Sequence, residues 1–335
     1  MHIAIIGYGY WGPNLLRNFD AREDCTVAMV CDPRRERLHA ARKHYPWVKA
    51  TSNAEDVFND TSIDAVCIAT PVYYHYDLAR KAIKHGKHVL LEKPMTSSVA
   101  QAQELIDLAL QKKVTLMVDH TFIYTDAVMK IKEIIDRGEL GDMQYFDSTR
   151  INLGLFQPDI NVLWDLAPHD ISILNFLTDE RPVSINATGM SHTKTGLENI
   201  AYLTLNYNSN LIAHFNCSWT SPVKIRQILI GGSEKMILFN DVEPTEKVKV
   251  YNTKYHILSG EDETRHKLLV DYRTGDIFIP KIEKTEALAK VAEDFVTAIT
   301  TGSKPMSDMY SGIEVVRILE AAQQSIKFRG AEVKL

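Results

Sequence analysis

Three glycines near the N-terminus have the spacing of a phosphate-binding loop. Gly7, Gly9 and Gly12 stand in the order G-x-G-x-x-G, directly after an apolar run and before a stretch with a helical pattern. In such loops the first glycine permits a tight turn, the second lets the backbone approach a pyrophosphate, and the third lets a helix pack on a strand. The helix N-terminus adds N–H donors and positive potential. This pattern favours the binding of a dinucleotide cofactor.

An acidic residue follows at the distance expected for such a cofactor. Asp32 lies 20 residues after Gly12, at the end of the second predicted strand, where a carboxylate binds the hydroxyls of the adenosine ribose. Since a carboxylate repels a 2′-phosphate, Asp32 favours NAD over NADP, but Arg34 or Arg35 could reach such a phosphate. In a second interpretation Asp32 is the N-cap of a helix that has Pro33 at its first position, and both arginines lie on a solvated helix face.

The elements that position these residues alternate over the first 120 residues. Short apolar runs alternate with amphipathic stretches such as 77–85 and 98–111. The apolar runs cover residues 2–6, 25–31, 65–69, 88–91 and 114–118. Buried strands that alternate with helices are typical of βαβ units, whose right-handed crossovers build a doubly wound parallel sheet. We therefore predict an NAD-binding Rossmann domain over residues 1–120.

The pattern changes after Asp119. A helix is predicted over residues 126–137, with Thr125 as its cap and Gly138 at its end. Three hairpins are predicted: 200–207 with 211–219, 223–230 with 235–240 around Gly231 and Gly232, and 267–272 with 276–279 around Thr274 and Gly275. Two amphipathic helices over 288–299 and 315–326 close the chain. This pattern predicts an α+β domain over residues 121–335 with a mostly antiparallel sheet, one face of which is expected to meet another subunit because few helices are available to cover it.

Composition excludes several classes of protein. Of the 335 residues 45% are hydrophobic and 24% are charged, which excludes a disordered or collagen-like chain, and the length predicts about two domains. The net charge of −5 argues against a nucleic-acid partner. No stretch is long and apolar enough for a spanning helix, and the N-terminus does not resemble a signal peptide. The four scattered cysteines fit the cytoplasm, and no grouping of side chains has the spacing of metal ligands.

Two further motifs indicate the class of enzyme. Ile68-Ala69-Thr70-Pro71 is followed by His75, and Leu91-Glu92-Lys93-Pro94 comes later. Together with the glycine loop they resemble the Gfo/Idh/MocA oxidoreductases, the family of glucose–fructose oxidoreductase and inositol dehydrogenase, over essentially the whole chain. The resemblance implies a C-terminal domain with a large open sheet whose exposed face forms the interface of a homodimer or homotetramer. The predicted cofactor-binding residues are Gly7, Gly9, Tyr10, Trp11, Gly12, Asp32, Thr70, Pro71, His75, Glu92 and Lys93.

The resemblance also implies the catalytic residues. In the family the lysine of the E-K-P motif lies beside the nicotinamide, and a downstream D-x-x-x-H pair supplies the other groups; here these are Lys93, Asp165 and His169. Oxidation of a secondary alcohol sends a proton to a base, and histidine titrates near neutral pH. We favour His169 as the base, Asp165 as the group that orients it, and Lys93 as the group that polarises the substrate oxygen. The sequence leaves open whether Lys93 or His169 takes the proton first.

Two local geometries are open for the Asp165–His169 pair. If Asp165 caps a helix, Pro168 falls in the first turn, where its missing N–H is tolerated, and His169 lies one turn from Asp165. If the helix begins at Pro168, a loop holds the pair. The alternative to a catalytic role is that Asp165 is only a cap and His169 a core histidine.

The substrate is suggested by two stretches. Residues 10–15 (YWGPNL) and 163–170 (LWDLAPHD) resemble the branch of the family associated with nucleotide-sugar metabolism. We therefore predict an NAD-dependent dehydrogenase, with NADP as the alternative cofactor, that oxidises the 3-hydroxyl of a nucleotide-linked sugar. The alternatives are an inositol or free aldose dehydrogenase, a non-catalytic NAD-sensing regulator, and an enzyme that uses NAD without net redox change. Candidate substrate-binding residues are His120, Tyr124, Arg150 and Asn161, for which packing roles are equally open.

Overall fold

The computed structural model describes residues 1–154, 156–252, 254–257, 270–273 and 275–335. The described residues form two compact units. Unit 1 comprises Met1–Thr125, Pro158–Ile160 and Thr285–Gln323, and unit 2 comprises Asp126–Gln157, Asn161–Lys284 and Gln324–Leu335. Among the described helices, none is both long enough and apolar enough to cross a membrane.

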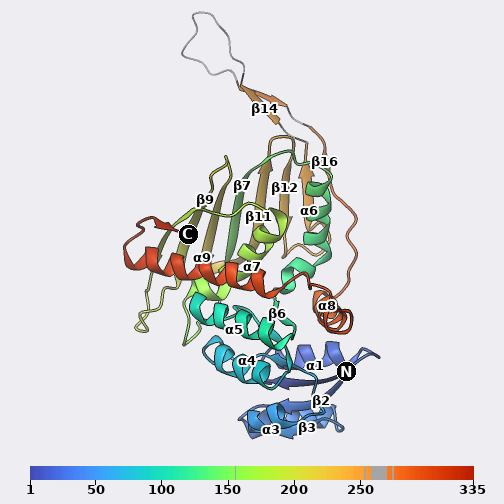
Figure 1. Ribbon diagram of the computed structural model, residues 1–335. Helices are drawn as coiled ribbons and strands as arrows, with labels where there is room; N and C mark the ends of the chain where they lie inside the picture. The colour runs from blue at the N-terminus through green and yellow to red at the C-terminus, as the bar shows by residue number, and fades with distance from the viewer. Residues whose placement is uncertain (155, 253, 258–269, 274) are drawn as a thin grey trace, which may run out of the picture. The chain divides into compact units, whose positions relative to one another are not determined.

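Unit 1 is built around a six-stranded parallel sheet with the order β3-β2-β1-β4-β5-β6 (Figure 1). Its strands are β1 (His2–Ile6), β2 (Thr26–Cys31), β3 (Lys49–Thr51), β4 (Ala65–Ile68), β5 (His88–Glu92) and β6 (Leu116–Asp119). The order is that of the doubly wound dinucleotide fold, and its switch point lies between β1 and β4. The predicted Rossmann sheet is therefore confirmed, with β3 added, a strand of three residues that is too short to show an apolar run.

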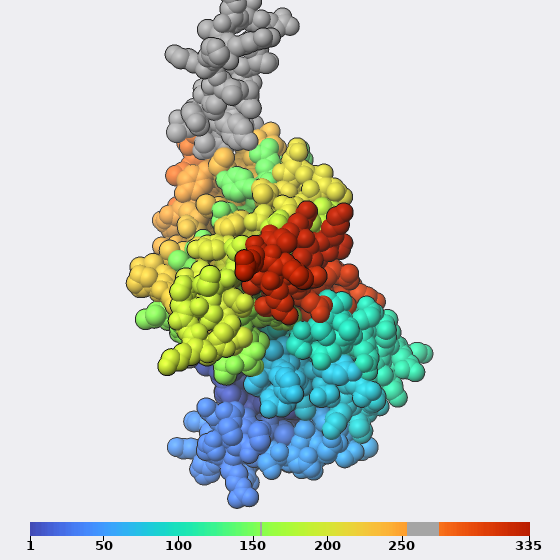
Figure 2. Space-filling view, turned by 90° about the vertical axis from the view of Figure 1, so that its left-hand side faces the viewer, coloured from blue at the N-terminus to red at the C-terminus, as the bar shows by residue number. Residues whose placement is uncertain are grey.

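The helices of unit 1 connect these strands and extend the unit at the C-terminal end of the chain. They are α1 (Gly12–Asp20), α2 (Arg35–His44), α3 (Ala54–Asn59), α4 (His75–Lys84), α5 (Val99–Lys112), α8 (Ala287–Thr301) and α9 (Met309–Lys327, in unit 1 up to Gln323), with the 3-10 helices η1 (Val72–Tyr74) and η2 (Thr121–Tyr124). Helices α4 and α5 lie side by side and form neighbouring light-blue and cyan surfaces in Figure 2. Helix α8 packs on α1 through Phe19 and Phe295, whose ring centroids are 6.2 Å apart.

Unit 2 contains a nine-stranded sheet with the order β16-β13-β12-β11-β7-β10-β9-β8-β17 (Figure 1). Its strands are β7 (Met143–Leu153), β8 (Ser184–Met190), β9 (Ile200–Asn206), β10 (Ile212–Ser218), β11 (Thr220–Gly232), β12 (Met236–Asn240), β13 (Val248–Tyr251), β16 (Ile277–Phe278) and β17 (Val333–Lys334). Strands β7 and β10 are parallel, and the other neighbours are antiparallel. The predicted, mostly antiparallel sheet is thus confirmed. Strands β14 (Lys254–Ile257) and β15 (Val270–Arg273) form a separate two-stranded sheet.

One face of the nine-stranded sheet is covered by helices of unit 2. Helix α7 (Val162–Leu177) packs on β7, β9 and β10, and α6 (Asp126–Asp136) packs on α7. We call this the inner face; Phe146 and Phe215 lie on it with their ring centroids 5.7 Å apart. Side chains at alternate positions face the other way and include the half-exposed Tyr202 and Leu229. Helix α6 confirms the predicted helix over 126–137, and Gly138, with a φ of +72°, follows its end.

The predicted hairpins have different outcomes. Strands β9 and β10 confirm the first hairpin. The second, β11 with β12, is confirmed as a pair, but Gly231 and Gly232 belong to β11 and not to the turn. They are glycines because of close packing: a Cβ at Gly231 would lie 1.9 Å from the ring of Tyr145, and one at Gly232 would lie 2.1 Å from the carbonyl oxygen of Leu140.

The third predicted hairpin is wrong in its pairing. Strand β15 pairs with β14, and β16 pairs with β13 at the edge of the large sheet. The two predicted strands do not pair with each other, because each of them pairs with a strand that lies earlier in the chain. Residues 267–269 and 274 of this prediction lie outside the described residues.

Candidate functional site

The first and third glycines of the loop after β1 are required by close backbone packing. Gly7 has a φ of +96°, and a Cβ on it would lie 2.5 Å from the carbonyl oxygen of Ala69. A Cβ on Gly12 would lie 2.2 Å from the carbonyl oxygen of Gly7. At Gly9, by contrast, the nearest described atom would be Nη2 of Arg34 at 3.8 Å. The loop is therefore tight at both ends and open at its centre, which is where a pyrophosphate must approach.

The N-terminus of α1 also fits an anion. Its N-cap is Trp11, and no side chain of the described residues caps it. The first N–H groups of the helix therefore keep their capacity for a ligand. Tyr10 and Trp11, both predicted to bind the cofactor, lie at this end with 83% and 37% of their surface exposed. Their rings meet edge to face, with centroids 5.5 Å apart.

Asp32 is buried at the end of β2 and is surrounded by donors. Its Oδ2 accepts from the backbone N–H of Tyr8 at 2.8 Å and from Nη2 of Arg34 at 2.9 Å. Its Oδ1 accepts from the backbone N–H and the Nε of Arg34, at 3.0 and 2.9 Å. Burial acts to raise the pKa of Asp32, but these hydrogen bonds outweigh it and leave the pKa below its usual value. Asp32 is thus ionised, and Arg34, not Asp32, is the N-cap of α2.

His75 joins the two motifs that follow β4 and β5. Its Nε2 lies 2.8 Å from the carbonyl oxygen of Thr70, and its Nδ1 lies 3.0 Å from that of Pro94. The imidazole is almost fully buried, and burial lowers its pKa. His75 therefore holds the segment around Thr70 and Pro71 against the loop that carries Lys93. The hydroxyl of Thr70 is buried and has no hydrogen-bond partner among the described residues, so it can serve a ligand.

A pair of buried acids lies at the carboxyl ends of β5 and β6. Glu92 and Asp119 are direct neighbours in the sheet register, and their carboxyl groups share a hydrogen bond. Burial, followed by the charge of Asp119, raises the pKa of Glu92 well above its usual value. Burial raises the pKa of Asp119 to about 6. The pair therefore holds a proton near neutral pH, as expected for two carboxyl groups that cannot both ionise in one buried site.

Lys93 follows Glu92 directly and is half-buried. Because β5 ends at Glu92, Lys93 lies at this edge of the sheet, and its charge acts on the pKa values of Glu92, Asp119 and His120. His120 is 1% exposed, and burial followed by the charge of Lys93 lowers its pKa to about 3, so its imidazole is neutral. Neither ring nitrogen has a hydrogen-bond partner within the described part of the chain. Tyr124 differs, because its hydroxyl donates to Asp294 at 2.6 Å and accepts from the N–H of Ser307 at 3.1 Å.

In unit 2 the D-x-x-x-H pair lies inside α7. Asn161 is the N-cap, and its Oδ1 accepts from the N–H of Trp164 at 3.1 Å. The helix begins six residues before Pro168, so the predictions of Asp165 as the cap and of Pro168 as the first residue are both wrong, while the spacing of one helical turn between Asp165 and His169, expected in the first geometry, is confirmed. Pro168 is tolerated inside the helix although it cannot donate to the carbonyl of Trp164.

The helix places Asp165 and His169 one turn apart, on the same face. The Oδ2 of Asp165 accepts from Nε1 of Trp219 at 3.0 Å, and Trp219 is 1% exposed. A buried indole therefore fixes the position of this carboxylate. Both Asp165 and His169 are half-buried.

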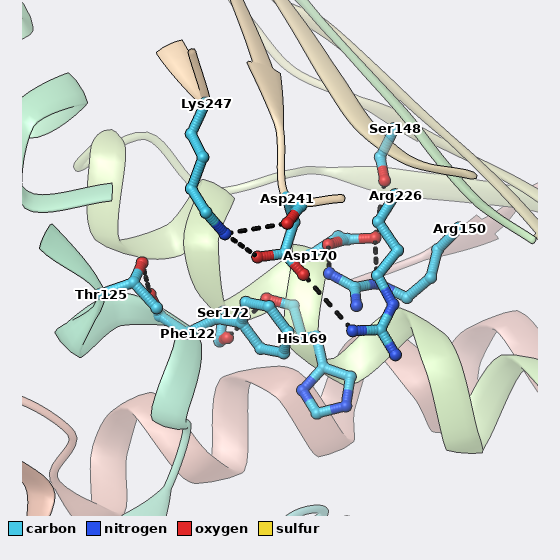
Figure 3. A network of polar contacts seen from close by, with 10 residues as sticks. All are labelled: Phe122, Thr125, Ser148, Arg150, His169, Asp170, Ser172, Arg226, Asp241 and Lys247. Atoms are coloured by element: carbon cyan, nitrogen blue, oxygen red, sulfur yellow. Dashed lines mark hydrogen bonds and ion pairs between the residues drawn. The ribbon is translucent and has the colours of Figure 1, made fainter. Parts of the chain in front are cut away.

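Arg150 and Asn161, two predicted substrate residues, have structural partners in unit 2. Arg150 is buried on the inner face and forms a two-pronged ion pair with Asp170, with Nε to Oδ2 at 2.9 Å and Nη2 to Oδ1 at 2.6 Å (Figure 3). Ser148 donates to the same carboxylate at 2.7 Å. Asn161 donates to Glu198 at 2.8 Å in addition to capping α7. These contacts fix α7 on the sheet beside His169.

Several polar residues of these sites were not predicted from the sequence. Asp119 could have been found, because it ends a parallel strand next to Glu92, and ligand sites gather at that edge. Trp219 and Asp170 have no comparable pattern, since their partners lie on distant elements. Among the residues that the structure describes, no group of three or more His, Cys, Asp or Glu side chains is placed to hold a metal ion.

Two family models match the chain. Residues 1–120 match the model described as "Oxidoreductase family, NAD-binding Rossmann fold". Residues 128–238 match the model of the GFO/IDH/MocA C-terminal domain. Between them the two models span more than half of the chain.

Individual relatives are similar over nearly the whole length. The chain is 26% identical to scyllo-inositol 2-dehydrogenase (NADP(+)) IolW of Bacillus subtilis, over 97% of this chain and 93% of that protein. It is also 26% identical to UDP-N-acetylglucosamine 3-dehydrogenase of Acidithiobacillus ferrooxidans, over 97% and 96%. The solved structure of GenD2 from gentamicin A biosynthesis in complex with NAD has the same fold, with a TM-score of 0.83 at 19% identity over 100% of this chain and 96% of that chain.

Proposed function

Because this chain belongs to the Gfo/Idh/MocA family of NAD-binding oxidoreductases, we propose that it transfers a hydride between the 3-hydroxyl of a nucleotide-linked sugar and NAD. The observation that carries the proposal is the position of Asp165 and His169 on one face of α7, with Asp165 held by Trp219. A relative similar along 97% of this chain is a UDP-N-acetylglucosamine 3-dehydrogenase, which supports the choice of substrate class and carbon.

The residues at the glycine loop fit the cofactor. We propose that the open centre at Gly9, the N-terminus of α1 and the hydroxyl of Thr70 bind NAD, with Asp32 and Arg34 near its adenosine ribose. When bound, NAD accepts or returns the hydride. The chain's own residues must then move one proton and stabilise charge on the substrate oxygen.

We assign these tasks to three side chains. His169 takes the proton from the substrate hydroxyl, and Asp165 stabilises the imidazolium that forms. Lys93 donates a hydrogen bond to the same oxygen as it gains negative charge. The neutral imidazole of His120 adds a donor or acceptor for the substrate, because its buried nitrogens lack a partner among the described residues. Tyr124 and Asn161 receive no such role, since their polar groups are engaged by Asp294 and by Glu198.

Cofactor reduction at 340 nm tests the proposal. Purified protein and NAD⁺ are assayed with UDP-sugars, free aldoses and inositols. Reduction with UDP-sugars alone is the expected result. Reduction with free polyols would establish the second candidate, an inositol or aldose dehydrogenase, which the similarity to scyllo-inositol 2-dehydrogenase favours. If none of these compounds reduces the cofactor while calorimetry shows that NAD⁺ still binds, both candidate functions are overturned, and a regulator or a redox-neutral enzyme is indicated.

The site assignment is tested by substitution. We expect Lys93→Ala and His169→Ala each to lower kcat by about 10²-fold or more and to leave NAD binding nearly intact, because each removes a proton-transfer or charge-stabilising group. Matched controls are His39→Ala and Lys43→Ala, two exposed residues of α2. Full activity in both site variants would overturn the assignment.

We further propose that the outer face of the nine-stranded sheet forms a homo-oligomer interface. Half-exposed apolar side chains on it, among them Tyr202, Ile212 and Leu229, support this. We expect Leu229→Glu to dissociate the oligomer in analytical ultracentrifugation, because it buries a charge at the contact. Leu110→Glu, at a position on α5 that is 54% exposed against 42% for Leu229, is the control and should leave the mass unchanged. A monomeric wild-type protein would refute the proposal.

A further inference from the structure

A row of charged side chains crosses the inner face of the nine-stranded sheet. In the register of β7 and β11, Arg150 and Arg226 are direct cross-strand neighbours. Arg226 has the same parity along β11 as the buried Ile228 and Ile230, so it lies on the inner face with Arg150. Asp241 follows β12 and continues the row, since its backbone N–H donates to the carbonyl oxygen of Arg226 at 2.9 Å.

The charges in this row do not balance. The Arg150–Asp170 ion pair is complete, with 5% and 2% of the two side chains exposed. Asp241 is the second carboxylate, and it serves two cations: its Oδ2 lies 3.3 Å from Nη1 of Arg226 and its Oδ1 lies 3.1 Å from Nζ of Lys247 (Figure 3). Among the described ion pairs of this row, three cations therefore meet two carboxylates. Like charges directly opposite each other in a sheet are destabilising, so the Arg150–Arg226 neighbours favour one more negative charge nearby.

The part of the row with the excess of positive charge, at Arg226 and Lys247, is partly exposed. The side chains of Arg226 and Lys247 are 34% and 35% exposed, and that of Asp241 is 17% exposed. Arg226 uses one of its five N–H groups on Asp241, so within the described part of the chain most of its guanidinium keeps donor capacity. Burial acts to raise the pKa of Asp241, but the charges of Lys247, Arg150 and Arg226 together leave it below its usual value. Asp241 is therefore ionised and holds both cations in place.

The row lies next to the proposed base. Asp170, which binds Arg150, is the residue after His169 on α7, and Arg150 is the cross-strand neighbour of Arg226. Figure 3 shows the imidazole of His169 together with the guanidinium groups of Arg150 and Arg226. A ligand whose hydroxyl meets His169 can thus place a second group toward Arg226.

We propose that Arg226 and Lys247 form a subsite for an anionic oxygen group of the substrate, either a carboxylate or a phosphate. The planar guanidinium of Arg226 offers paired donors for two oxygens of the group, and Lys247 adds a point charge. The ligand supplies the negative charge that the row lacks. This inference rests on the proposed dehydrogenase function, because it assigns the anion to the molecule whose hydroxyl His169 deprotonates.

A binding experiment tests the subsite without any turnover. Calorimetry measures the affinity of the full-length protein, with NAD present, for glucuronate, glucose 6-phosphate, UDP-glucose and glucose. We expect Arg226→Gln to weaken the binding of at least one of the three anions about tenfold or more, because a charge-assisted hydrogen bond is lost. The affinity for glucose should stay unchanged. The three anionic probes distinguish a ring carboxylate, a phosphate monoester and a nucleotide diphosphate.

Matched variants test whether the loss of affinity is specific to this subsite. Lys247→Gln should lose less affinity for the same anion, and Arg226→Lys should keep part of the affinity, which shows that the protein is folded. Lys249→Gln is the control, because Lys249 is similarly exposed, at 30%, and pairs with Glu246 outside the row. The proposal is overturned if the wild type binds no anion more tightly than glucose, or if Lys249→Gln loses as much as Arg226→Gln. Failure of the proposed function is a separate result, seen as absent cofactor reduction by the wild type with every sugar.

Discussion

The two units handle buried charge in opposite ways. In unit 1 the carboxyl ends of β5 and β6 bring together Glu92 and Asp119, which share a hydrogen bond and have raised pKa values. In unit 2 the inner face of the sheet brings together Arg150, Asp170 and Asp241 with further cations, and the arginine–carboxylate pairs are ionised. In unit 1 the buried carboxyl groups limit their charge by keeping a proton, whereas in unit 2 the buried carboxylates are neutralised by ion pairs with cations.

The difference fits the roles proposed above for Lys93, Asp165 and His169. In that proposal a proton held beside Lys93 can move during the reaction, which suits a group that acts on the substrate oxygen as it gains and loses charge. An ion pair of Arg150 with Asp170 cannot move in this way, and its two-pronged geometry fixes α7 in one position. In the proposed function, unit 1 contributes a proton that can move, and unit 2 contributes fixed positions for Asp165 and His169.

The largest expected effect comes from breaking a pair in unit 2. Arg150→Met leaves Asp170 as a buried carboxylate with Ser148 as its one remaining side-chain donor among the described residues, so the free energy of unfolding should fall by about 3–5 kcal/mol. Urea denaturation measures this change. The double variant Arg150→Met with Asp170→Asn removes the uncompensated charge and should recover most of the loss.

A surface pair supplies the control for this prediction. Arg137 pairs with Glu133 on α6 with its side chain 62% exposed, and Arg137→Met should change the free energy of unfolding far less than Arg150→Met, because an ion pair in solvent contributes little. If Arg150→Met costs as little as Arg137→Met, the inner-face pair does not fix α7, and the contrast between the units disappears.

The contrast also explains what the sequence could reveal. Gly7, Gly9, Gly12 and Asp32 form a local pattern that the dinucleotide fold requires, and the alternating strands predicted the six-stranded sheet, which is confirmed. The family resemblance on Glu92 and Lys93 is confirmed by the two family models. These features are visible because backbone turns and sheet edges are set by residues close together in sequence.

The polar groups of unit 2 are not visible in this way. Arg226 and Arg150 meet only through the register of β7 and β11, which lie 76 residues apart at that point. The cap of α7 is a further case, because Asn161 precedes an apolar turn and the sequence pointed instead to a start at Asp165 or at Pro168. Pairing across strands depends on register and on which face a strand turns inward, and neither is fixed by local residue types.

The second prediction concerns the proton in unit 1. The pKa of Asp119 is about 6 in the folded protein, against an ordinary value of 3.8. Between these values the folded state binds more protons than the unfolded state, so this group's stabilisation is fully present below pH 3.8 and is lost as the pH rises through about 6. Asp119→Asn removes this dependence. The free energy of unfolding of the wild type relative to the variant should therefore fall by about 3 kcal/mol across that window.

Urea denaturation of both proteins at several pH values measures this difference. Carboxylates away from this site are common to both proteins and cancel in the comparison, whereas Glu92, whose pKa is raised in part by the charge of Asp119, belongs to the pair that the experiment tests. Asp107→Asn, an exposed position on α5, is the control and should follow the wild type. Parallel pH profiles for the wild type and Asp119→Asn would mean that unit 1 stores no proton at this pair.

The smallest effect is expected where unit 1 does use an ion pair. Asp32 accepts four N–H groups, two on each oxygen, and so has no free lone pair for a ribose hydroxyl while Arg34 is in place. The side chain of Arg34 is 49% exposed and can meet a 2′-phosphate instead. Arg34→Ala should therefore lower the ratio of kcat/KM for NADP to that for NAD by about tenfold, because one charge-assisted contact is lost and two acceptor sites on Asp32 are released.

Arg35→Ala, at the first residue of α2, is the matched control. An equal loss in both variants would mean that general positive charge, and not the Asp32–Arg34 pair, sets the cofactor preference, and a ratio unchanged in both would leave Arg34 as no more than a partner that neutralises a buried carboxylate.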